Sequence, residues 1–328
     1  MSIIEAQPSV SRNTHENLQR LIKTAQEQPA VTVAVAHPCD QVSLESAIEA
    51  AKLDLIIPIL VGPEQRIRTV AEKNGLDISG FEIVDADYSQ DSARKAVALV
   101  REGRAEALMK GSLHTDEAMS AVVARDTGLR TDRRISHCFI MDVPDYDHPL
   151  IITDAAVNIA PDLKAKMHII QNAIDLAHAL GATDVRVAIL SAMESVNPDV
   201  PSTLEAAALC KMADRGQITG ARIDGPLALD NAISPQAAAI KRIASPVAGR
   251  ANVLVVPDLE AGNMLAKSLS FLADADSAGI VLGAKVPIIL TSRADEPMAR
   301  LASCAVATLL VAAARATTAS AARKNAAA

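Results

Sequence analysis

The chain has 328 residues and half of them are apolar, which is enough to bury large cores and excludes both a disordered tail and a small disulfide-stapled scaffold. Only five residues are aromatic and none is Trp, so the chain lacks the rings from which base-stacking platforms are built. The net charge of −7 also opposes a phosphate-backbone partner, and we therefore expect no nucleic-acid partner.

The compartment is predicted from the N-terminus and the cysteines. The first residues carry neither the basic start nor the long apolar core of a secretory signal. The four cysteines lie far apart without a C-x-x-C pair, which favours reduced thiols over a zinc knuckle or a disulfide framework. We therefore expect a cytoplasmic protein. The longest uncharged run, Leu301–Ala314, falls short of the ~20 residues needed to cross a bilayer, so it predicts a buried core helix and no membrane partner.

Short runs of Val, Ile and Leu recur along the chain and predict strands buried on both faces. In chain order they are Val31–Ala36, Ile56–Val61, Phe81–Val84, Ala107–Met109, Ile135–Met141, Ile151–Thr153, Val185–Leu190, Val253–Val256, Ile280–Leu282 and Val286–Leu290. Stretches with helical spacing lie between most of them, namely Ser43–Lys52, Ser89–Arg101, Lys164–Leu180, Ser202–Arg215 and Asn263–Asp274. This alternation is typical of βαβ units and predicts an α/β fold with a largely parallel sheet.

Two segments depart from this alternation. Asp142–Pro149 contains two prolines and three aspartates without a regular period, and it is the best candidate for a domain boundary. From Arg315 onward the chain is rich in Ala, Thr, Ser and Lys, and we expect this tail to fray.

Polar segments follow several of the predicted strands. They are His37-Pro38, Lys110–Thr115, Ser191, Pro257–Asn263 and Thr291–Arg293. Ligands of open parallel sheets bind beyond the carboxyl ends of the strands. These segments are therefore predicted to converge on a single cleft.

The segment Thr291–Asp295 combines hydroxyl groups, an arginine and a predicted helix start. Backbone N–H groups and the helix dipole favour an anion at such a place, and Arg293 adds a guanidinium that can bind two phosphate oxygens. The segment therefore predicts a phosphate-binding site. The alternative, that Ser292 or Asp295 caps the helix while Arg293 is a solvated charge, stays open.

A second candidate phosphate contact is Lys110-Gly111-Ser112. Glycine permits close backbone approach and lysine adds charge, although the full G-x-x-x-x-G-K-[ST] pattern is absent. His114 fits a base, a phosphate donor or a structural hydrogen-bonding role beside a helix start.

Two acidic segments are further candidates. Asp224–Asn231 combines a turn with two carboxylates and fits metal binding, substrate positioning or turn chemistry. In Pro257–Asn263, Asp258 stands where a ligand would bind and Asn263 is placed to cap the next helix, with a plain strand-to-helix turn as the alternative. No G-x-G-x-x-G follows a strand and no ordered set of metal ligands occurs, so the residues alone predict an α/β protein that binds something phosphorylated.

Six short blocks, taken together, carry a family resemblance. They are Met109–Thr115, Ile135–His137, Ile223–Ala232, Ser245–Gly249, Val256–Asn263 and Leu290–Asp295. In this order they resemble the phosphate acetyltransferase/phosphate butyryltransferase family, which exchanges CoA and inorganic phosphate on a short acyl group. The resemblance extends from about Val31 to Ala314.

The resemblance implies two α/β domains of the isocitrate/isopropylmalate-dehydrogenase type, with mostly parallel sheets and an interdomain cleft. The first domain would comprise residues 1–137 plus 286–328, with the C-terminal helix returning to it, and the second residues 138–285. A homodimer is implied as well. The implied reaction is direct acyl transfer in a ternary complex with acyl-CoA and inorganic phosphate as substrates, with no bound cofactor and no metal.

The resemblance also implies site residues. Ser292, Arg293 and Asp295 are the expected catalytic residues: Arg293 neutralises and orients phosphate, and Ser292 donates to the developing oxyanion or to the sulfur. The expected substrate-binding residues are Lys110, Gly111, Ser112, His114, Ser136, Asp224, Asp258 and Asn263. Typical phosphate acetyltransferases place an Asp, proposed as the base for the CoA thiol, seven residues after the Ser. This chain has Ala299 there. The candidates to replace the missing carboxylate are Asp295 and Glu296, of which Asp295 is the expected catalytic residue.

The acyl group and the function class leave alternatives. Phosphate acetyltransferase leads because acetyl transfer is the commoner metabolic role, whereas the Ser-Arg-Ala-Asp form and the segments Met109–Gly111 and Asp258–Asn263 resemble the butyryl-transferring branch. A non-catalytic CoA-binding relative would explain Ala299. The remaining alternative is an NAD- and metal-dependent decarboxylating dehydrogenase of the same fold, with the metal ligands Asp154, Asp224 and Asp230.

Overall fold

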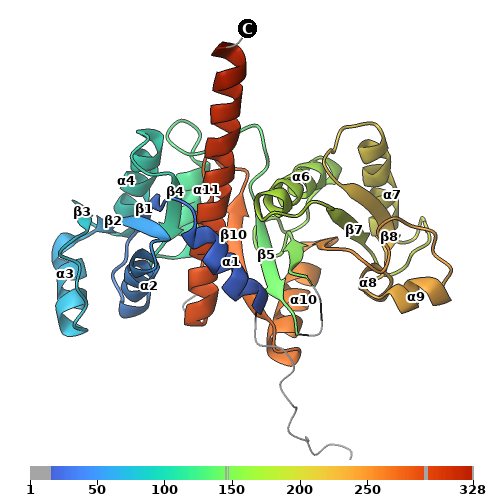
Figure 1. Ribbon diagram of the computed structural model, residues 1–328, viewed down its shortest axis with the longest axis horizontal. Helices are drawn as coiled ribbons and strands as arrows, with labels where there is room; N and C mark the ends of the chain where they lie inside the picture. The colour runs from blue at the N-terminus through green and yellow to red at the C-terminus, as the bar shows by residue number, and fades with distance from the viewer. Residues whose placement is uncertain (1–15, 145, 147, 292–294, 327–328) are drawn as a thin grey trace, which may run out of the picture.

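A mixed sheet extends across the molecule from β3 at one end to β8 at the other, with helices packed along it (Figure 1). The computed structural model describes residues 16–144, 146, 148–291 and 295–326. Within these residues the sheet has 11 strands in the order β3-β2-β1-β4-β11-β10-β5-β6-β9-β7-β8. The last two strands of the chain therefore lie in the middle of the sheet.

The first part of the chain alternates helices and strands. Its elements are α1 (Glu16–Gln26), β1 (Val31–Ala36), α2 (Gln41–Lys52), β2 (Ile56–Gly62), α3 (Glu64–Lys73), β3 (Glu82–Asp85), α4 (Ser89–Arg101), β4 (Ala107–Lys110) and α5 (Thr115–Val123). The strands pair in parallel, and β1 lies between β2 and β4 with Ala36 opposite Val61 on one side and Lys110 on the other. Their buried aliphatic side chains make the sheet the centre of the core.

The second part of the chain continues with two antiparallel strands before parallel pairing resumes. Its elements are β5 (Ser136–Asp142), β6 (Leu150–Thr153), α6 (Leu163–Ala179), β7 (Arg186–Leu190), α7 (Pro201–Asp214), β8 (Arg222–Leu227), α8 (Leu229–Ile233), α9 (Pro235–Ile240), β9 (Val253–Val255) and α10 (Leu259–Leu272). The chain then returns to the middle of the sheet with β10 (Asp276–Leu282), β11 (Ile288–Ile289) and α11 (Pro297–Ala326).

Strand direction reverses near the middle of the sheet. β10 is antiparallel to both β11 and β5, and β5 is antiparallel to β6, whereas the other pairs are parallel. This confirms an α/β fold with a mostly parallel mixed sheet. The strands β1, β4 and β11 therefore run in the same direction as β5, and their C-terminal ends lie on the same side of the sheet as the C-terminal end of β5. The strands β6, β7, β8 and β9 run in the opposite direction, so their C-terminal ends lie on the side of the sheet where β5 begins.

Each predicted strand is present, and the differences lie in the connections. Asp224–Asn231 was predicted to be a turn, yet Arg222–Leu227 forms β8, because an outermost strand tolerates Gly225-Pro226. The helix predicted from Asn263 begins at Leu259, and its cap is Asp258, whose carboxylate accepts a hydrogen bond from Ala261 N at 2.8 Å.

The expectation of a fraying tail is wrong, because α11 continues to Ala326. Alanine-rich sequence favours a helix, and Arg315 forms an ion pair with Glu106, the residue before β4. By length and composition alone, Pro297–Ser320 could cross a membrane, but 56% of the residues in the most apolar window are buried inside the protein. Figure 1 shows α11 crossing the middle of the molecule beside β10 and α1, as predicted for a core helix.

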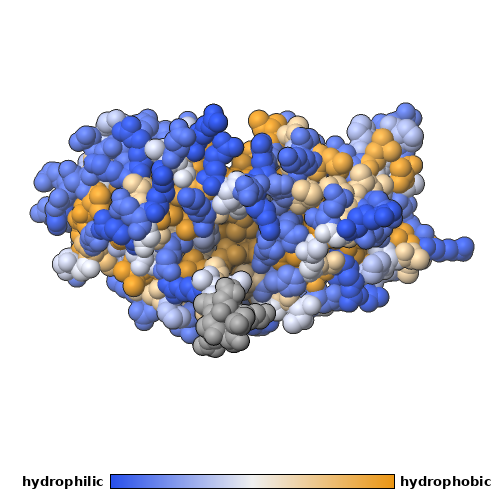
Figure 2. All heavy atoms as spheres, turned by 90° about the horizontal axis from the view of Figure 1, so that it is seen from above, coloured by the Kyte–Doolittle hydropathy of each residue, from blue (hydrophilic) through white to orange (hydrophobic). Residues whose placement is uncertain are grey.

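The surface is unevenly apolar. Seen from above, hydrophilic side chains dominate most of the visible face, with hydrophobic side chains gathered in patches between them (Figure 2). Elsewhere, α10 exposes three large apolar side chains, with Met264 63%, Phe271 85% and Leu272 86% exposed. Neighbouring exposed apolar side chains of this size are typical of a surface that a partner covers.

Candidate active site

The loop after β4 lies beside the chain that follows β11. Leu108 is opposite Ile288 and Met109 is opposite Ile289 in this parallel pair. The register therefore brings Lys110 and Gly111 next to Leu290 and Thr291. Ser292 and Arg293, the predicted catalytic pair, come next in the chain but lie outside the described residues.

Gly111 and Ser112 join the loops after β4 and β1. Gly111 N donates to Ala36 O at 2.8 Å, and a Cβ at this glycine would lie 2.5 Å from the same oxygen, so no larger residue fits. Ser112 N and Oγ both donate to His37 O, at 2.9 and 2.8 Å. The predicted substrate contacts Gly111 and Ser112 therefore also hold the backbone of the site.

Lys110 and His114 frame the same loop. Lys110 is buried, and its Nζ donates to Gly111 O at 3.1 Å and to Leu113 O at 3.3 Å. His114 is exposed at the start of α5, where its backbone N donates to Glu117 Oε2 at 3.0 Å. Hydrogen bonds from Ser89 and from this N–H lower the pKa of Glu117. The His114 imidazole is thus presented to solvent at a helix N-terminus.

A buried histidine and carboxylate lie at the opposite edge, where β5 begins and β6 ends. His137 and Asp154 are 2% and 3% exposed. Burial lowers the pKa of His137 to about 4, although the charge of Asp154 favours the protonated imidazole. The Asp154 carboxylate accepts hydrogen bonds from the backbone N of Ala156, Val157 and Asn158 at 3.0 to 3.1 Å, which satisfies the buried charge.

His137 connects this edge with the strand that leads to Thr291. A Cβ on Gly279 of β10 would lie 3.0 Å from His137 Nε2 and 3.4 Å from Leu290 O. The imidazole therefore occupies the space between β5, β10 and the end of β11. Its Nδ1 is buried and has no hydrogen-bond partner among the described residues.

The loop after β6 packs against the start of α10. Leu259 N donates to Ile159 O at 3.0 Å, and Asn263 Nδ2 donates to Ala155 O at 3.4 Å. A Cβ on Gly262 would lie 2.9 Å from the Cβ of Ala155, so glycine allows this close approach. The predicted residues Asp258 and Asn263 are thereby tied to Asp154 through one short loop, defined here as the 154–159 loop.

Apolar packing brings the two groups of loops together. Val157 of the 154–159 loop and Leu290 both pack against a buried cluster that contains Leu113, from the loop after β4. Three of the polar segments predicted to share a cleft, those at residues 110, 257 and 291, are therefore connected indirectly, through this cluster and the 154–159 loop. His37 joins them through Ser112, whereas the Ser191 hydroxyl pairs with Ser202 Oγ at 2.8 Å instead.

Two predicted substrate-binding residues lie apart from this group. Ser136 is fully buried, and its hydroxyl accepts a hydrogen bond from Asn172 Nδ2 of α6 at 2.9 Å, which gives it a packing role. Asp224 stands on β8, three strands from β6, and accepts from Gly225 N at 2.8 Å. Its carboxylate helps to raise the pKa of Cys210 to about 12, although burial is the larger cause.

The position after the predicted catalytic pair also differs from expectation. Asp295 precedes α11 instead of lying on it, and its carbonyl accepts a hydrogen bond from Arg300. Ala299, where typical acetyltransferases have an Asp, is buried in the first turn of α11. Asp295 therefore lies just before α11, whereas Ala299 lies within its first turn.

The ligands suggested for a metal-dependent dehydrogenase do not meet. Asp154 is occupied by backbone N–H groups, Asp224 is on the outer strand, and Asp230 lies on α8 with Lys241 3.9 Å away. Across the described part of the chain, no group of three or more His, Cys, Asp or Glu residues could hold a metal ion. The described residues thus give that alternative no metal site.

A large recess lies beside the loop after β4. It has a volume of about 890 Å³, lies between α4 and α5, and is lined by Arg94, Arg101, Asp116 and Glu117 among others. Glu117 is the residue that receives the His114 N–H, so the recess begins beside the loop after β4. Its lining mixes both signs of charge.

The sequence reasoning overlooked three residues of this region. His137 was quoted in the Ile135–His137 block but not selected, and Asp154 was considered only as a metal ligand. Asn158, which donates to Asp154 Oδ2 at 2.5 Å, was not considered. The available signal was the strand period, which places His137 on the sheet face opposite to Ser136.

Comparison with known proteins identifies the group. The family model "Phosphate acetyl/butaryl transferase" matches residues 86–308. A phosphate acetyltransferase of Rhizobium meliloti is 65% identical over 90% of this chain and 94% of its own length. A phosphate butyryltransferase of Clostridium acetobutylicum is 41% identical over 87% and 94%. The crystal structure of a branched-chain phosphotransacylase from Enterococcus faecalis superimposes with a TM-score of 0.75 at 31% identity, covering 86% of this chain and 99% of that one.

The family match includes the loops around Lys110, Asp154 and Thr291 and the strands β4 to β11 that carry them, and the Enterococcus structure covers 86% of the chain. The chain therefore belongs to the phosphate acetyl/butyryl transferase family.

Proposed function

We propose that the protein is a phosphate acetyltransferase, which converts acetyl-CoA and inorganic phosphate into acetyl phosphate and CoA. The observation that carries this proposal is the 65% identity with the Rhizobium acetyltransferase over nearly the whole of both chains. The butyryltransferase is more distant, at 41%. Overall identity thus favours acetyl transfer even though several short motifs resemble the butyryl branch.

In the proposed reaction a phosphate oxygen attacks the thioester carbonyl carbon, and the CoA thiolate leaves and takes up a proton. Both substrates are held together, so no covalent enzyme intermediate forms and no bound cofactor takes part. Arg293 binds and orients phosphate, and Ser292 donates to the oxyanion or the sulfur. Lys110 and Asn263 contribute further substrate contacts; Asn263 is bonded to Ala155 of the 154–159 loop, whose Val157 packs against the cluster that contains Leu113.

The role of general base remains with Asp295 in this proposal. Its backbone carbonyl accepts a hydrogen bond from Arg300 directly before α11, and in the sequence it follows Arg293 by two residues. A non-catalytic CoA-binding relative is the second candidate, favoured by the buried Ala299 at the family's Asp position. It predicts CoA binding without turnover.

We further propose two domains, residues 1–137 plus 286–328 and residues 138–285, with the active site in the cleft between them. The reversal of strand direction at β10, β5 and β6 supports a division in this region, and α11 contacts α1, α2 and β11 of the first part. The protein would act in the cytoplasm as a homodimer. The exposed apolar side chains of α10 support an interface.

Phosphate-dependent release of free CoA thiol tests the proposed function. Purified protein is given acetyl-CoA, propionyl-CoA or butyryl-CoA, each with and without phosphate. We expect release that requires phosphate and a kcat/KM that is highest for acetyl-CoA. A maximum with butyryl-CoA would instead assign the butyryl branch, and no release with any donor would favour the non-catalytic relative.

A further inference from the structure

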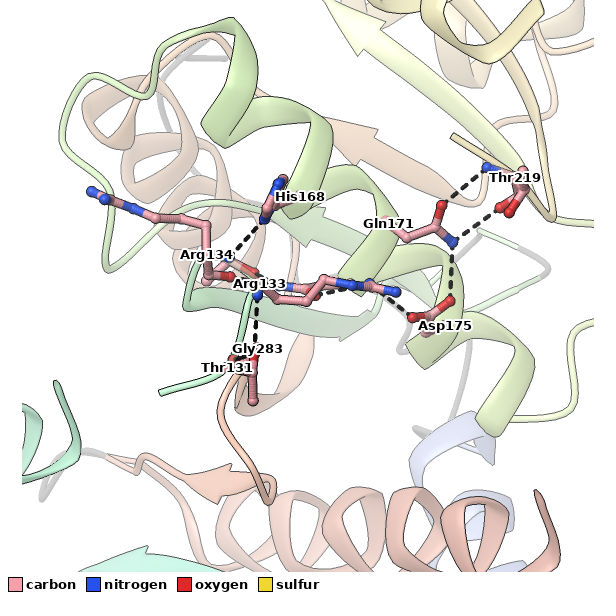
Figure 3. A network of polar contacts seen from close by, with 10 residues as sticks. Thr131, Arg133, Arg134, His168, Gln171, Asp175, Thr219 and Gly283 are labelled. Atoms are coloured by element: carbon pink, nitrogen blue, oxygen red, sulfur yellow. Dashed lines mark hydrogen bonds and ion pairs between the residues drawn. The ribbon is translucent and has the colours of Figure 1, made fainter. Parts of the chain in front are cut away.

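Two consecutive arginines before β5 extend in different directions (Figure 3). Arg133 extends along α6, where its guanidinium donates to Asn172 Oδ1 at 3.2 Å and pairs with Asp175 at 2.9 Å. Arg134 extends away from α6. Both side chains are exposed, yet only the first has a carboxylate partner among the described residues.

Arg134 is held on three sides. Its backbone N donates to His168 Nδ1 at 2.9 Å, and its carbonyl accepts from Asn172 Nδ2 at 2.9 Å. Its Nε donates to Asn158 Oδ1 at 2.7 Å. The guanidinium is therefore oriented before any ligand arrives, while its terminal nitrogens make no hydrogen bond to the described residues.

The anchor of Arg134 is itself buried and fixed. Asn158 donates through Nδ2 to Ile135 O at 2.8 Å and to Asp154 Oδ2 at 2.5 Å. Asn158 and Asp154 are both almost completely buried. A rigid, buried pair of this kind fixes the guanidinium plane, which reduces the entropy lost when an anion binds.

This anchor belongs to the 154–159 loop, which also contacts the start of α10 and the apolar cluster of Leu113. Arg134 is therefore attached to the loop that joins the candidate substrate contacts. Arg134 comes from the chain directly before β5, whereas Arg293, the other arginine assigned to phosphate, comes from the chain after β11.

We propose that Arg134 is a second phosphate-binding residue of the active site, and this rests on the proposed function. Its free guanidinium nitrogens form a fork that matches two oxygens of a phosphate group. The phosphate group belongs either to inorganic phosphate or to CoA, since both substrates carry one. The experiment below separates these sources.

The test compares Arg134→Gln with Arg133→Gln, a matched control on the neighbouring residue. KM and kcat are measured for phosphate and for acetyl-CoA. In Arg134→Gln we expect the KM of one phosphate-bearing substrate to rise about tenfold or more, because a charge-assisted hydrogen bond is lost. Arg133→Gln should change each KM less than about twofold.

Acetyl-pantetheine, which lacks the phosphate groups of CoA, distinguishes the two sources. If Arg134 binds inorganic phosphate, the variant's defect stays when acetyl-pantetheine replaces acetyl-CoA. If it binds a CoA phosphate, the defect disappears with acetyl-pantetheine. Arg134→Lys, which keeps the charge without the fork, should give an intermediate KM and guards against a glutamine variant that fails to fold.

Equal KM values in Arg134→Gln and Arg133→Gln, with the wild type active, would overturn this proposal and leave the acetyltransferase assignment intact. Absence of phosphate-dependent CoA release from the wild type would overturn the assignment itself. In that case, titration calorimetry compares the binding of phosphate and of CoA by the wild type and by Arg134→Gln, and so tests whether Arg134 binds a phosphate group. Weaker binding by Arg134→Gln would support its role, and unchanged binding of both would refute it.

Discussion

The His137 imidazole lies buried between β5, β10 and the end of β11, where water could not solvate a charged ring. Burial in this position outweighs the attraction of Asp154 and keeps the ring neutral at physiological pH. The neutral ring packs edge-on against Phe139, two residues further along β5, with ring centroids 4.4 Å apart.

Acid should therefore weaken the fold through His137. Its pKa is about 4 in the folded protein and about 6.5 in an unfolded chain, so between these values only the unfolded state binds the proton. The free energy of unfolding should fall as the pH decreases from 6.5 to 4. Urea denaturation of the wild type and of His137→Asn across this range isolates the effect, because other titrating groups are shared.

The stability difference between the wild type and His137→Asn should shrink as the pH falls, because the variant has no imidazole to protonate. A difference that stays constant from pH 7 to pH 4 would contradict a neutral, buried His137.

Arg293 is predicted to bind phosphate, so Arg293→Ala should raise the KM for phosphate and lower kcat. The loss of one charged contact corresponds to about ten- to a hundredfold in kcat/KM. Thermal unfolding should change little. Steady-state kinetics with varied phosphate checks this, and unaltered kinetics would remove Arg293 from the site.

At the scale of elements, the strands were predictable and several of the connections were not. Runs such as Val31–Ala36 and Val253–Val256 are apolar on both faces, which only a covered sheet explains. β8 escaped prediction because Gly225-Pro226 has the composition of a turn, and only its place at the end of the sheet makes it tolerable. The start of α10 was predicted four residues too late, because Asp258 and not Asn263 is the N-cap residue.

The candidate site was predictable as a set of segments but not as a set of contacts. Lys110, Asn263 and Thr291 were found because polar residues follow apolar strands. The 154–159 loop that links them has no sequence signature of its own, since its role depends on long-range pairing of β6 with β5 and β9. Ser136 and Asp224 were selected from the same blocks, yet their packing depends on α6 and β7.

The close contact between the loops after β1 and β4 gives a further prediction. In Gly111→Ala the new Cβ would meet backbone oxygens of Ala36 and His37, which cannot move independently of the sheet. We expect a loss of about 1–3 kcal/mol in the free energy of unfolding and lower activity, because Lys110 and Ser112 shift together. Chemical denaturation and the CoA-release assay measure both effects.

Gly80→Ala is the matched control, since nothing lies within 4 Å of a Cβ there. It should change stability by less than about 0.5 kcal/mol and leave activity intact. Equal stability of the two variants would show that the approach at Gly111 is not tight.

At the scale of the whole molecule, the apolar side chains of α10 bear on the oligomeric state. Phe271 and Leu272 are almost completely exposed, and a second copy of this 34.3 kDa chain that covered them would remove apolar surface from water. In sedimentation velocity we expect the wild type to have twice this mass, as a dimer, and the double variant Phe271→Ser/Leu272→Ser to have the mass of a monomer.

Ile57→Ser provides the control, because Ile57 is exposed on β2 in the other part of the sheet. This variant should keep the mass of the wild type in sedimentation velocity. If the α10 variant also remains a dimer, the interface lies elsewhere.

The position of β10 and β11 between β4 and β5 has a consequence for the newly synthesised chain. The strands β4 and β5 are synthesised long before β10 and β11, which lie between them. Until the C-terminal residues have been translated, β4 and β5 therefore each have an unpaired backbone edge. We expect nascent chains that end before Asp276 to stay associated with chaperones, and folding to finish only after the C-terminal segment is released.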